Sequence, residues 1–172
     1  RYTTLIPGAA ETAERLQKMG IKIGTTTGFT REMMNIVIPA AERQGYHPDS
    51  VVTSDEMPAG RPKPWMIYQN TINLGIYPLS HIVKVGDTLS DINEGRNAGT
   101  WTVGVIKGSS ELGMSEEDVN RCDPDTLADK MEVVEQRFKD AGADYVIESI
   151  DQLHEILPKI DLRISQMEGT IR

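Results

Sequence analysis

Several residue types are scarce in this sequence, and each scarcity excludes a class of function. One cysteine and three histidines among 172 residues are too few to assemble a zinc site of the usual spacing. Cys122 has no partner for an intrachain disulfide, so a reducing, cytoplasmic location is expected. No apolar run approaches the roughly 18 residues that cross a bilayer. The N-terminus has no signal-peptide core, so neither a membrane span nor secretion by a visible signal is expected.

Positive charge is scarce too. The 18 Lys and Arg residues stand against 26 Asp and Glu residues, the net charge is -8, and the basic residues are scattered. Nucleic-acid binding needs a cationic face, so nucleic acid is not an expected partner. Carboxylates are the only metal ligands in good supply. A bound metal should therefore be a hard cation such as Mg²⁺.

What the chain does contain is an ordinary globular composition, 38% hydrophobic and 26% charged. This composition excludes disorder along the whole length and, at this size, predicts one domain, residues 1–172, with a substantial core. The chain begins at Arg1 rather than at a methionine, in a stretch without a start signal, which suggests a fragment of a longer protein.

Short apolar runs rich in β-branched residues alternate with stretches of helical period. Helices are predicted over residues 8–19, 30–44, 64–74, 90–98, 126–141 and 150–157, and strands over 21–25, 51–53, 81–85, 101–106 and 145–147. This alternation predicts the α/β class, with a Rossmann-like parallel sheet flanked by helices. Pro39 lies inside the second helix and should kink it or end it early.

In such a sheet, ligands bind beyond the carboxyl ends of the strands, and this rule selects three places. The first is Thr25–Thr30, which leaves an apolar strand and enters a helix. The hydroxyls of Thr26 and Thr27, the unhindered backbone of Gly28 and the free N–H groups of the next helix could together hold a phosphoryl-like anion. The alternative is a strand-to-helix turn capped by Thr30.

The second place is the loop 58–65, Pro-Ala-Gly-Arg-Pro-Lys-Pro-Trp. Prolines fix the path of the chain around Arg61, and Gly60 removes bulk beside it, so the cation should have a defined position. A guanidinium can grip two oxygens of a phosphoryl or phosphonyl group. The alternative is a solvated arginine in a rigid loop.

The third place follows the apolar strand that ends near Val85. Asp87 stands at the strand tip, and Asp91 comes four residues later in the first turn of a helix. Two carboxylates this close repel each other unless a cation lies beside them, so this pattern predicts a Mg²⁺ site. The alternative makes Ser90 the N-cap and Asp91 a partner of the helix dipole, but it leaves Asp87 unexplained.

The three places follow one another along the chain as a hydroxyl after a strand, a cation in a loop, and a Gly-Asp-x-x-x-Asp sequence after another strand. In this order they resemble motifs two, three and four of the haloacid dehalogenase superfamily. Most members have lysine at the third motif, where this chain has Arg61. The stretches 21–34, 59–65 and 84–105 resemble more closely the phosphonoacetaldehyde hydrolases, a family that has arginine there. This resemblance extends from Gly8 to about Leu157.

The resemblance implies a role for each matching residue. Thr27 would bind the phosphonyl oxygens with help from Thr26 and Gly28, and Arg61 would neutralise the transferring group. Asp87 would be a Mg²⁺ ligand, and Asp91 would support the metal shell. The implied reaction is hydrolysis of phosphonoacetaldehyde to acetaldehyde and phosphate, in a homodimer formed through a helical cap domain.

The family's covalent chemistry needs two further groups. A lysine in the cap forms a Schiff base with the aldehyde, and an aspartate in an Asp-x-Ala-x-Thr motif attacks phosphorus. Both would lie upstream of Arg1, and the similar run at residues 123–126 has the wrong spacing and follows no strand. No nucleophile is therefore assigned in this chain, and the chain alone is expected to be inactive.

The missing motif has a structural consequence. In the family, the first strand lies between the strand that carries Thr27 and the strand that carries Asp87. We therefore expect that the chain is not an autonomous fold and that residues preceding Arg1, or a partner piece, supply this strand.

Two alternatives remain open at this point. A phosphatase or phosphomutase with the same core would act on phosphate esters and need no Schiff-base lysine. A non-catalytic Mg²⁺-binding α/β module, such as a receiver-like domain, would have an acidic pair at its first strand and a late lysine, and neither is visible in this sequence.

Overall fold

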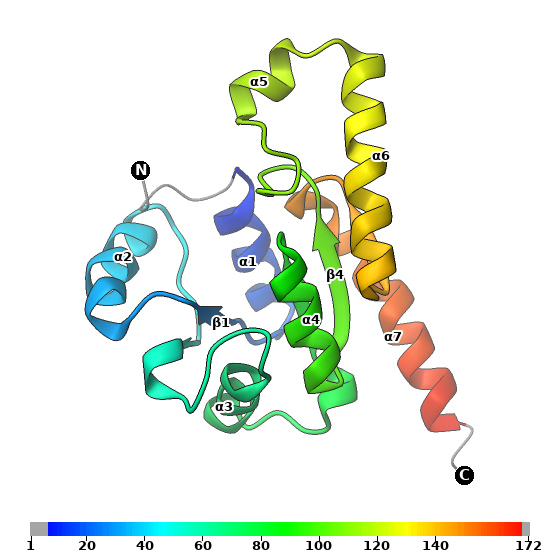
Figure 1. Ribbon diagram of the computed structural model, residues 1–172. Helices are drawn as coiled ribbons and strands as arrows, with labels where there is room; N and C mark the ends of the chain where they lie inside the picture. Colours follow the sequence, from blue (N-terminus) through cyan, green and yellow to red (C-terminus); the bar gives the residue numbers. More distant parts are fainter. Residues whose placement is uncertain (1–6, 170–172) are drawn as a thin grey trace.

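The computed structural model describes residues 7–169 (Figure 1). Its helices are α1 (Ala9–Lys18), α2 (Arg31–Arg43), α3 (Trp65–Leu74), α4 (Leu89–Ala98), α5 (Glu116–Arg121), α6 (Pro124–Ala141) and α7 (Leu153–Gly169). Its strands are β1 (Gly24–Thr27), β2 (Ser50–Thr53), β3 (Val83–Gly86), β4 (Trp101–Val105) and β5 (Tyr145–Ile147). Short 3₁₀ turns are η1 (Ser54–Glu56), η2 (Leu79–His81) and η3 (Ile150–Gln152).

The strands form two separate parallel sheets. One contains β1 and β2, and the other has the order β3-β4-β5. Gly24 lies opposite Ser50 in the first sheet, and Gly86 lies opposite Gly104 in the second. Among residues 7–169, no strand pairing joins β1 to β3. Each of these two strands is therefore an edge whose backbone groups are unpaired on one side.

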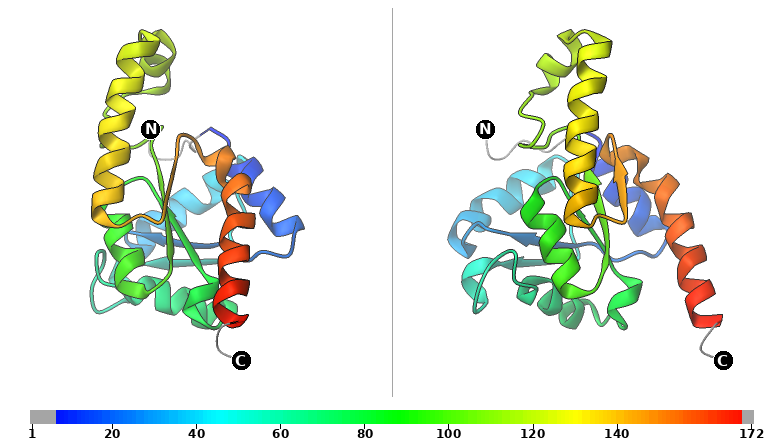
Figure 2. Two further views of the ribbon diagram at one scale, coloured as in Figure 1. Left: turned by 90° about the vertical axis from the view of Figure 1, so that its right-hand side faces the viewer. Right: turned by 45° about the vertical axis from the view of Figure 1, so that its right-hand side comes forward.

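Helices cover both faces of the larger sheet. On one face, α1 and α7 pack against the strands, and the shared core contains Leu16, Trp101, Val103, Val105, Ile147, Leu153, Ile156 and Ile160. On the other face, α4 and α6 pack around Ile92, Ile106, Leu112, Met131, Val134 and Phe138. Figure 2 shows these two layers from the side, with α6 and α5 projecting beyond the sheets. The smaller sheet packs against α3.

A large cavity lies between the two sheets. Its volume is about 930 Å³, and its lining includes residues from both edge strands, β1 and β3, and from the helices around them. Apolar side chains in the lining include Leu16, Ile23, Ile67, Val83, Val85 and Ile160. Its polar lining includes Thr26, Arg61 and Asp91. We call this space the inter-sheet cavity.

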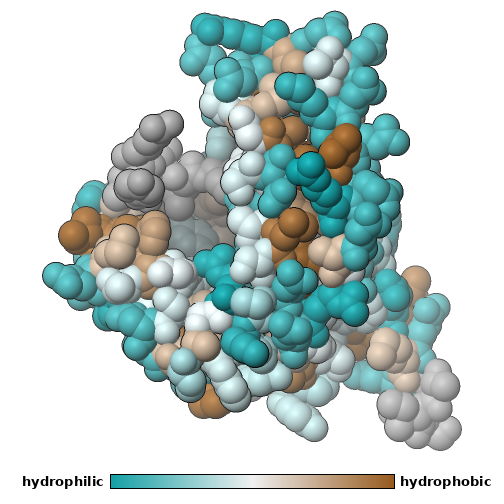
Figure 3. All heavy atoms as spheres, viewed as in Figure 1, coloured by the Kyte–Doolittle hydropathy of each residue, from teal (hydrophilic) through white to brown (hydrophobic). Residues whose placement is uncertain are grey.

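Apolar side chains are also present at the surface. Figure 3 shows a hydrophobic patch over α2, at its left edge. In this helix, Met33 is 47% exposed and Ile36 is 71% exposed. No helix among residues 7–169 is both long enough and apolar enough to cross a bilayer.

The predicted α/β class, with parallel strands flanked by helices, is confirmed, and β5 has its predicted bounds. The other elements lie within a few residues of their predicted positions, apart from the last helix. The ends of the predicted domain, residues 1–6 and 170–172, lie outside the described residues.

The strand predicted over 21–25 is displaced: β1 spans Gly24–Thr27, and Ile21, at the start of the predicted strand, is 37% exposed. The helix predicted over 30–44 is α2, which continues past Pro39 to Arg43, so of the two expectations for this proline the early end is wrong. Pro39 and Asn35 are both exposed, so water can bond to the carbonyl that proline leaves without an N–H partner.

The last helix was predicted to end at residue 157, just before Pro158. Instead, α7 continues through Pro158 to Gly169, after the 3₁₀ turn η3. The buried side chains Leu153, Ile156 and Ile160 explain why the helix continues, since they pack it against the sheet on both sides of the proline.

Candidate active site

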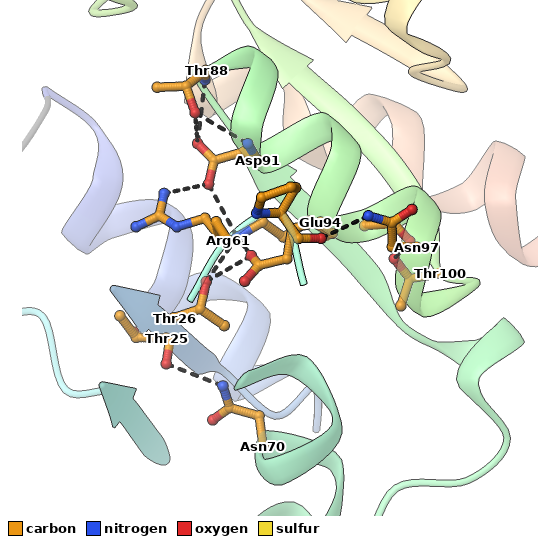
Figure 4. Close-up of polar contacts among 12 residues, drawn as sticks. Thr25, Thr26, Arg61, Asn70, Thr88, Asp91, Glu94, Asn97 and Thr100 are labelled. Atoms are coloured by element: carbon orange, nitrogen blue, oxygen red, sulfur yellow. Dashed lines mark hydrogen bonds and ion pairs between the residues drawn. The ribbon is translucent and has the colours of Figure 1, made fainter. Parts of the chain in front are cut away.

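The three predicted places meet beside the carboxyl ends of β1 and β3 (Figure 4). Arg61 comes from the turn before α3, and its Nη1 donates to Oδ1 of Asp91 at 2.7 Å. A side-chain carbon built on Gly28 would lie 3.9 Å from Nη2 of Arg61. The loop after Thr27 and the start of α4 therefore lie on two sides of one guanidinium.

Asp91 is the most heavily bonded side chain of this cluster, and it is only 4% exposed. Its Oδ2 accepts hydrogen bonds from the backbone N–H groups of Asp87 and Thr88, each at 3.2 Å, and from the Thr88 hydroxyl at 2.9 Å. Its Oδ1 receives Arg61 and, at 3.3 Å, Nζ of Lys84.

These contacts set the charge state of Asp91. Burial would raise the pKa of Asp91, but the charges of Lys84 and Arg61 and the Thr88 hydroxyl together lower it. Thr88, rather than Ser90, is the N-cap of α4, and it forms a capping box with Asp91. The reading that made Ser90 the cap was therefore wrong.

Gly86 allows Asp91 to approach the end of β3. A Cβ on Gly86 would lie 2.2 Å from Cβ of Asp91 and 2.7 Å from its Oδ2. No side chain fits there, because real Cβ atoms do not come closer than about 3.0 Å to other heavy atoms. The glycine of the Gly-Asp motif is therefore required by close packing.

Asp87 lies beside Asp91 in a half-buried position. Desolvation and the negative charge of Asp91 raise the pKa of Asp87, and the Arg61 charge offsets part of this shift. The Ser109 hydroxyl donates to the backbone carbonyl of Asp87 and so ties this loop to the segment that follows β4. A cation placed beside Asp87 would stabilise its charged form.

The start of α2 differs from the prediction. The Thr27 hydroxyl accepts from the backbone N–H of Phe29 at 3.1 Å, and Thr30 caps the helix by accepting from Met33 at 3.2 Å. The N–H of Arg31 donates to the carboxylate of Asp55 at 3.1 and 3.2 Å. The expectation that the first N–H groups of this helix are free for an anion is therefore wrong for Arg31 and Met33.

Sequence reasoning missed a buried polar cluster next to these residues. Nζ of Lys84 lies 2.8 Å from Oε1 of Glu94 and 2.9 Å from Oγ1 of Thr26, and the Thr26 hydroxyl donates to Glu94 at 3.0 Å. Glu94 is fully buried. A lysine between two valines of an apolar strand was the available signal. The role of Thr26 in substrate binding stays a prediction, because its hydroxyl already has these partners.

Asp87 and Asp91 offer the hard oxygen ligands that Mg²⁺ prefers. Both oxygens of Asp91 already accept hydrogen bonds, so Asp87 is the better placed of the two to contact a cation directly. Residues 7–169 contain no group of three or more His, Cys, Asp or Glu side chains that could hold a metal ion. Water or substrate oxygens would have to complete a Mg²⁺ shell there.

The sequence is similar to several curated proteins. It is 55% identical over 161 residues to phosphonoacetaldehyde hydrolase of Bacillus anthracis, covering 94% of this chain and 61% of that protein. It is 56% identical to a bifunctional phosphonoacetaldehyde hydrolase/aminoethylphosphonate transaminase of Clostridioides difficile, covering 93% of this chain and 25% of that protein. The chain thus spans less than two thirds of the length of these relatives.

Solved structures give a consistent result. A phosphonoacetaldehyde hydrolase-like protein from Oleispira antarctica superposes with a TM-score of 0.92 at 36% identity, covering 95% of this chain and 59% of that one. A putative β-phosphoglucomutase from Thermotoga maritima, at 18% identity and a TM-score of 0.63, shares the fold. The family model for haloacid dehalogenase-like hydrolases matches residues 1–99. The chain therefore belongs to the haloacid dehalogenase-like hydrolases.

Proposed function

We propose that the protein hydrolyses the carbon–phosphorus bond of phosphonoacetaldehyde, giving acetaldehyde and phosphate. The observation that carries this proposal is the position of Arg61, whose guanidinium lies between Asp91 and the Gly28 backbone. An arginine at this place is the feature that separates the phosphonoacetaldehyde hydrolases from lysine-containing relatives. The 55% identity to proteins of that name supports the same substrate.

The proposed roles follow from what each side chain can offer. The Thr27 hydroxyl and the Gly28 backbone bind phosphonyl oxygens, and Thr26 holds the strand behind them. Arg61 contributes positive charge where the transferring group gains negative charge. Its Nη1 is held by Asp91, so Nη2, on the side of Gly28, faces the proposed phosphonyl position.

A Mg²⁺ ion at Asp87, with Asp91 supporting its shell, would supply positive charge to the phosphonyl oxygens and orient them. Support for the ion comes from the raised pKa of Asp87, which has desolvation and a neighbouring carboxylate as its main causes. These are the conditions that a bound cation relieves.

The covalent steps need groups that we do not assign to this chain. A lysine amine would condense with the aldehyde, so that the electron pair of the breaking carbon–phosphorus bond flows into an iminium and leaves an enamine. An aspartate would accept the phosphoryl group, and water would then release phosphate from it and acetaldehyde from the enamine. We propose that both groups, with the cap through which a homodimer forms, are supplied by residues outside these 172.

We further propose that the inter-sheet cavity accepts a β-strand, supplied by residues preceding Arg1 or by a partner piece. The edges of β1 and β3 both face this cavity, and each unsatisfied buried backbone group costs about 1–3 kcal/mol. A few such groups equal the net stability of a domain, about 5–15 kcal/mol. A stable monomer of these 172 residues that unfolds cooperatively would refute this proposal.

The low cysteine content supports a cytoplasmic location, and the net charge of -8 argues against a nucleic-acid partner. Both statements are proposals about the whole protein. Fractionation of cells that express the full-length protein tests the first, and binding to labelled DNA and RNA tests the second.

The experiment that tests the reaction uses the full-length protein with phosphonoacetaldehyde and Mg²⁺. We expect acetaldehyde and phosphate in equal amounts, and we expect borohydride to trap the substrate carbon chain on the protein. A protein that hydrolyses phosphate esters without any trapped adduct would be a phosphatase or phosphomutase instead. A protein inactive on both substrate classes would fit the non-catalytic module.

A further inference from the structure

Lys84 and Glu94 form a buried ion pair for which the proposed reaction has no direct use. The Lys84 side chain is 11% exposed and the Glu94 side chain 0%, with Nζ and Oε1 2.8 Å apart. Removing two charges from water costs several kcal/mol per ion, and apolar residues in their place are often equally stable. A pair of this kind therefore calls for an explanation other than stability.

The Lys84 ammonium lies close to three different acceptors. They are Oε1 of Glu94 at 2.8 Å, Oγ1 of Thr26 at 2.9 Å and Oδ1 of Asp91 at 3.3 Å. An ammonium has three donors and no acceptor, so the three oxygens around Nζ match its capacity. Lys84 therefore has one preferred orientation, although its side chain is long.

These acceptors belong to different parts of the site. Thr26 lies in β1 and immediately precedes Thr27, whereas Asp91 and Glu94 lie in α4 beside the larger sheet. No strand pairing joins β1 to β3 among residues 7–169. The contact between Lys84 and Thr26 is thus a side-chain connection across the two sheets, next to the residues proposed to bind substrate.

Asp91 Oδ1 is shared between Lys84 and Arg61. Arg61 lies in a turn, its side chain is 23% exposed, and it is proposed to contact substrate. The position of its guanidinium can therefore change when substrate binds. Lys84 stands in a strand and is less exposed. Of the two cations, Lys84 is the one that stands in a strand and is not proposed to contact substrate.

We infer that Lys84 is a positioning residue: it fixes Asp91, and through Asp91 the guanidinium of Arg61, relative to the strand that carries Thr26 and Thr27. Glu94 holds the Lys84 ammonium in place from the opposite side. The identity of the ligand that benefits rests on the proposed function, but the positioning itself does not.

The test must separate positioning from a general loss of stability. Lys84→Met alone would leave Glu94 buried without a cation, and such a change costs 3–5 kcal/mol. The double variant Lys84→Met/Glu94→Gln instead replaces both charges with neutral side chains of similar length, and Gln can still accept from Thr26. Glu94→Gln alone is the matched control, because the amide oxygen of Gln can still accept from the Lys84 ammonium and Lys84 keeps its contact with Asp91.

The readout is backbone amide exchange, measured by NMR on the full-length protein. The N–H groups of Asp87 and Thr88 donate to Asp91 Oδ2, so their exchange reports where that carboxylate stands. We expect their exchange to rise several-fold, up to about tenfold, in the double variant, as for the loss of a charge-assisted hydrogen bond. Glu94→Gln alone should leave it unchanged.

A capping box elsewhere in the chain gives an internal control. The N–H of Ser115 donates to Oδ2 of Asp118 at 3.0 Å, in the same kind of capping box at the start of α5. Its exchange should not change in either variant. An unchanged rate at Asp87 and Thr88 in the double variant, or an equal rise at all three amides, would overturn the inference.

A second measurement needs no substitution and applies even if the double variant does not fold. The ammonium protons of Lys84, which is 11% exposed and has three acceptor oxygens near Nζ, should exchange slowly enough for a resolved ¹⁵N signal in the wild-type protein. Exchange at the rate of a solvated lysine would overturn the inference.

Failure of the proposed function would look different. A wild-type protein that does not cleave phosphonoacetaldehyde would end that proposal and leave the exchange results intact. If it does cleave this substrate, the double variant should lower kcat/KM by about a hundredfold, the penalty for a displacement of about 1 Å in an active site.

Discussion

The substitution Gly86→Ala tests the geometry of the site with a single methyl group. Its Cβ would lie 2.2 Å from Cβ, 2.5 Å from Cγ and 2.7 Å from Oδ2 of Asp91. Ordinary contacts begin at 3.4 Å, so the Asp91 side chain must recede by more than an ångström. Asp91 is 4% exposed and bonded at both oxygens, so a displacement of this size disturbs its present hydrogen bonds.

The expected cost can be estimated from those bonds. A hydrogen bond to a charged group contributes about 1.5–3 kcal/mol, and displacement of Asp91 would weaken at least those from Arg61 and Thr88. Alanine recovers about 0.4–1 kcal/mol by restricting the unfolded chain. We therefore expect a net loss of about 2–4 kcal/mol in the free energy of unfolding, and a fall of about a hundredfold in kcat/KM for phosphonoacetaldehyde.

Gly104→Ala is the matched control, because Gly104 lies opposite Gly86 in the neighbouring strand. Its Cβ would lie 2.7 Å from Cδ2 of Phe138, in the core below α6 and away from the site. Overpacking of this kind costs about 1–3 kcal/mol, so the two variants should lose comparable stability. Urea unfolding and steady-state kinetics on the full-length proteins measure both quantities. If Gly86→Ala loses no more kcat/KM than Gly104→Ala, the argument about Asp91 is refuted.

Three further predictions concern the same cluster. Arg61→Lys should lower kcat/KM about a hundredfold with little change in stability, because a single ammonium cannot contact both Asp91 and a phosphonyl group beside Gly28. Unchanged kinetics would contradict the proposed role of Arg61. Asp87→Asn should raise the free energy of unfolding by about 0.5–1 kcal/mol while weakening Mg²⁺ binding measured by calorimetry. The pKa of Asp87 is raised in the folded protein, so the gain in stability should be absent below pH 3.8, the usual pKa of aspartate. The gain should appear as the pH rises above 3.8 and be complete above the pKa of Asp87 in the folded protein. A gain that is constant from pH 3 to 8 would show that it does not come from the charge of Asp87. Ser109→Ala should cost about 1–3 kcal/mol, because the carbonyl of Asp87 loses a buried donor, and urea unfolding would show it.

Much of the site was predictable from the sequence because its signals are local. A hydroxyl, a cation and an acidic pair each follow or adjoin a recognisable strand or turn, and parallel strands bring their carboxyl ends to one edge. Arg61, Asp87 and Asp91 do lie together, and the backbone of Gly28, next to Thr27, lies beside Arg61. Their roles in binding and catalysis stay predictions.

The missed features depend on contacts between distant residues. Lys84 and Thr26 are far apart in the sequence, and a lysine in a strand gives no indication of the acceptors it will meet. Asp55 occupies the start of α2 from a turn after β2, which no pattern within residues 25–30 could reveal. The length of α7 beyond Pro158 was missed because burial against the sheet outweighs a local helix-breaking signal.

The central claim is that Thr27, Arg61 and Asp87 together hold a phosphonyl group beside a cation. A crystal structure of the full-length protein with Mg²⁺ and a stable alkylphosphonate tests it most directly. We expect the guanidinium of Arg61 and the hydroxyl of Thr27 to contact phosphonyl oxygens and a carboxylate oxygen of Asp87 to contact the metal. A phosphonate bound elsewhere, with Arg61 paired only to Asp91, would contradict it.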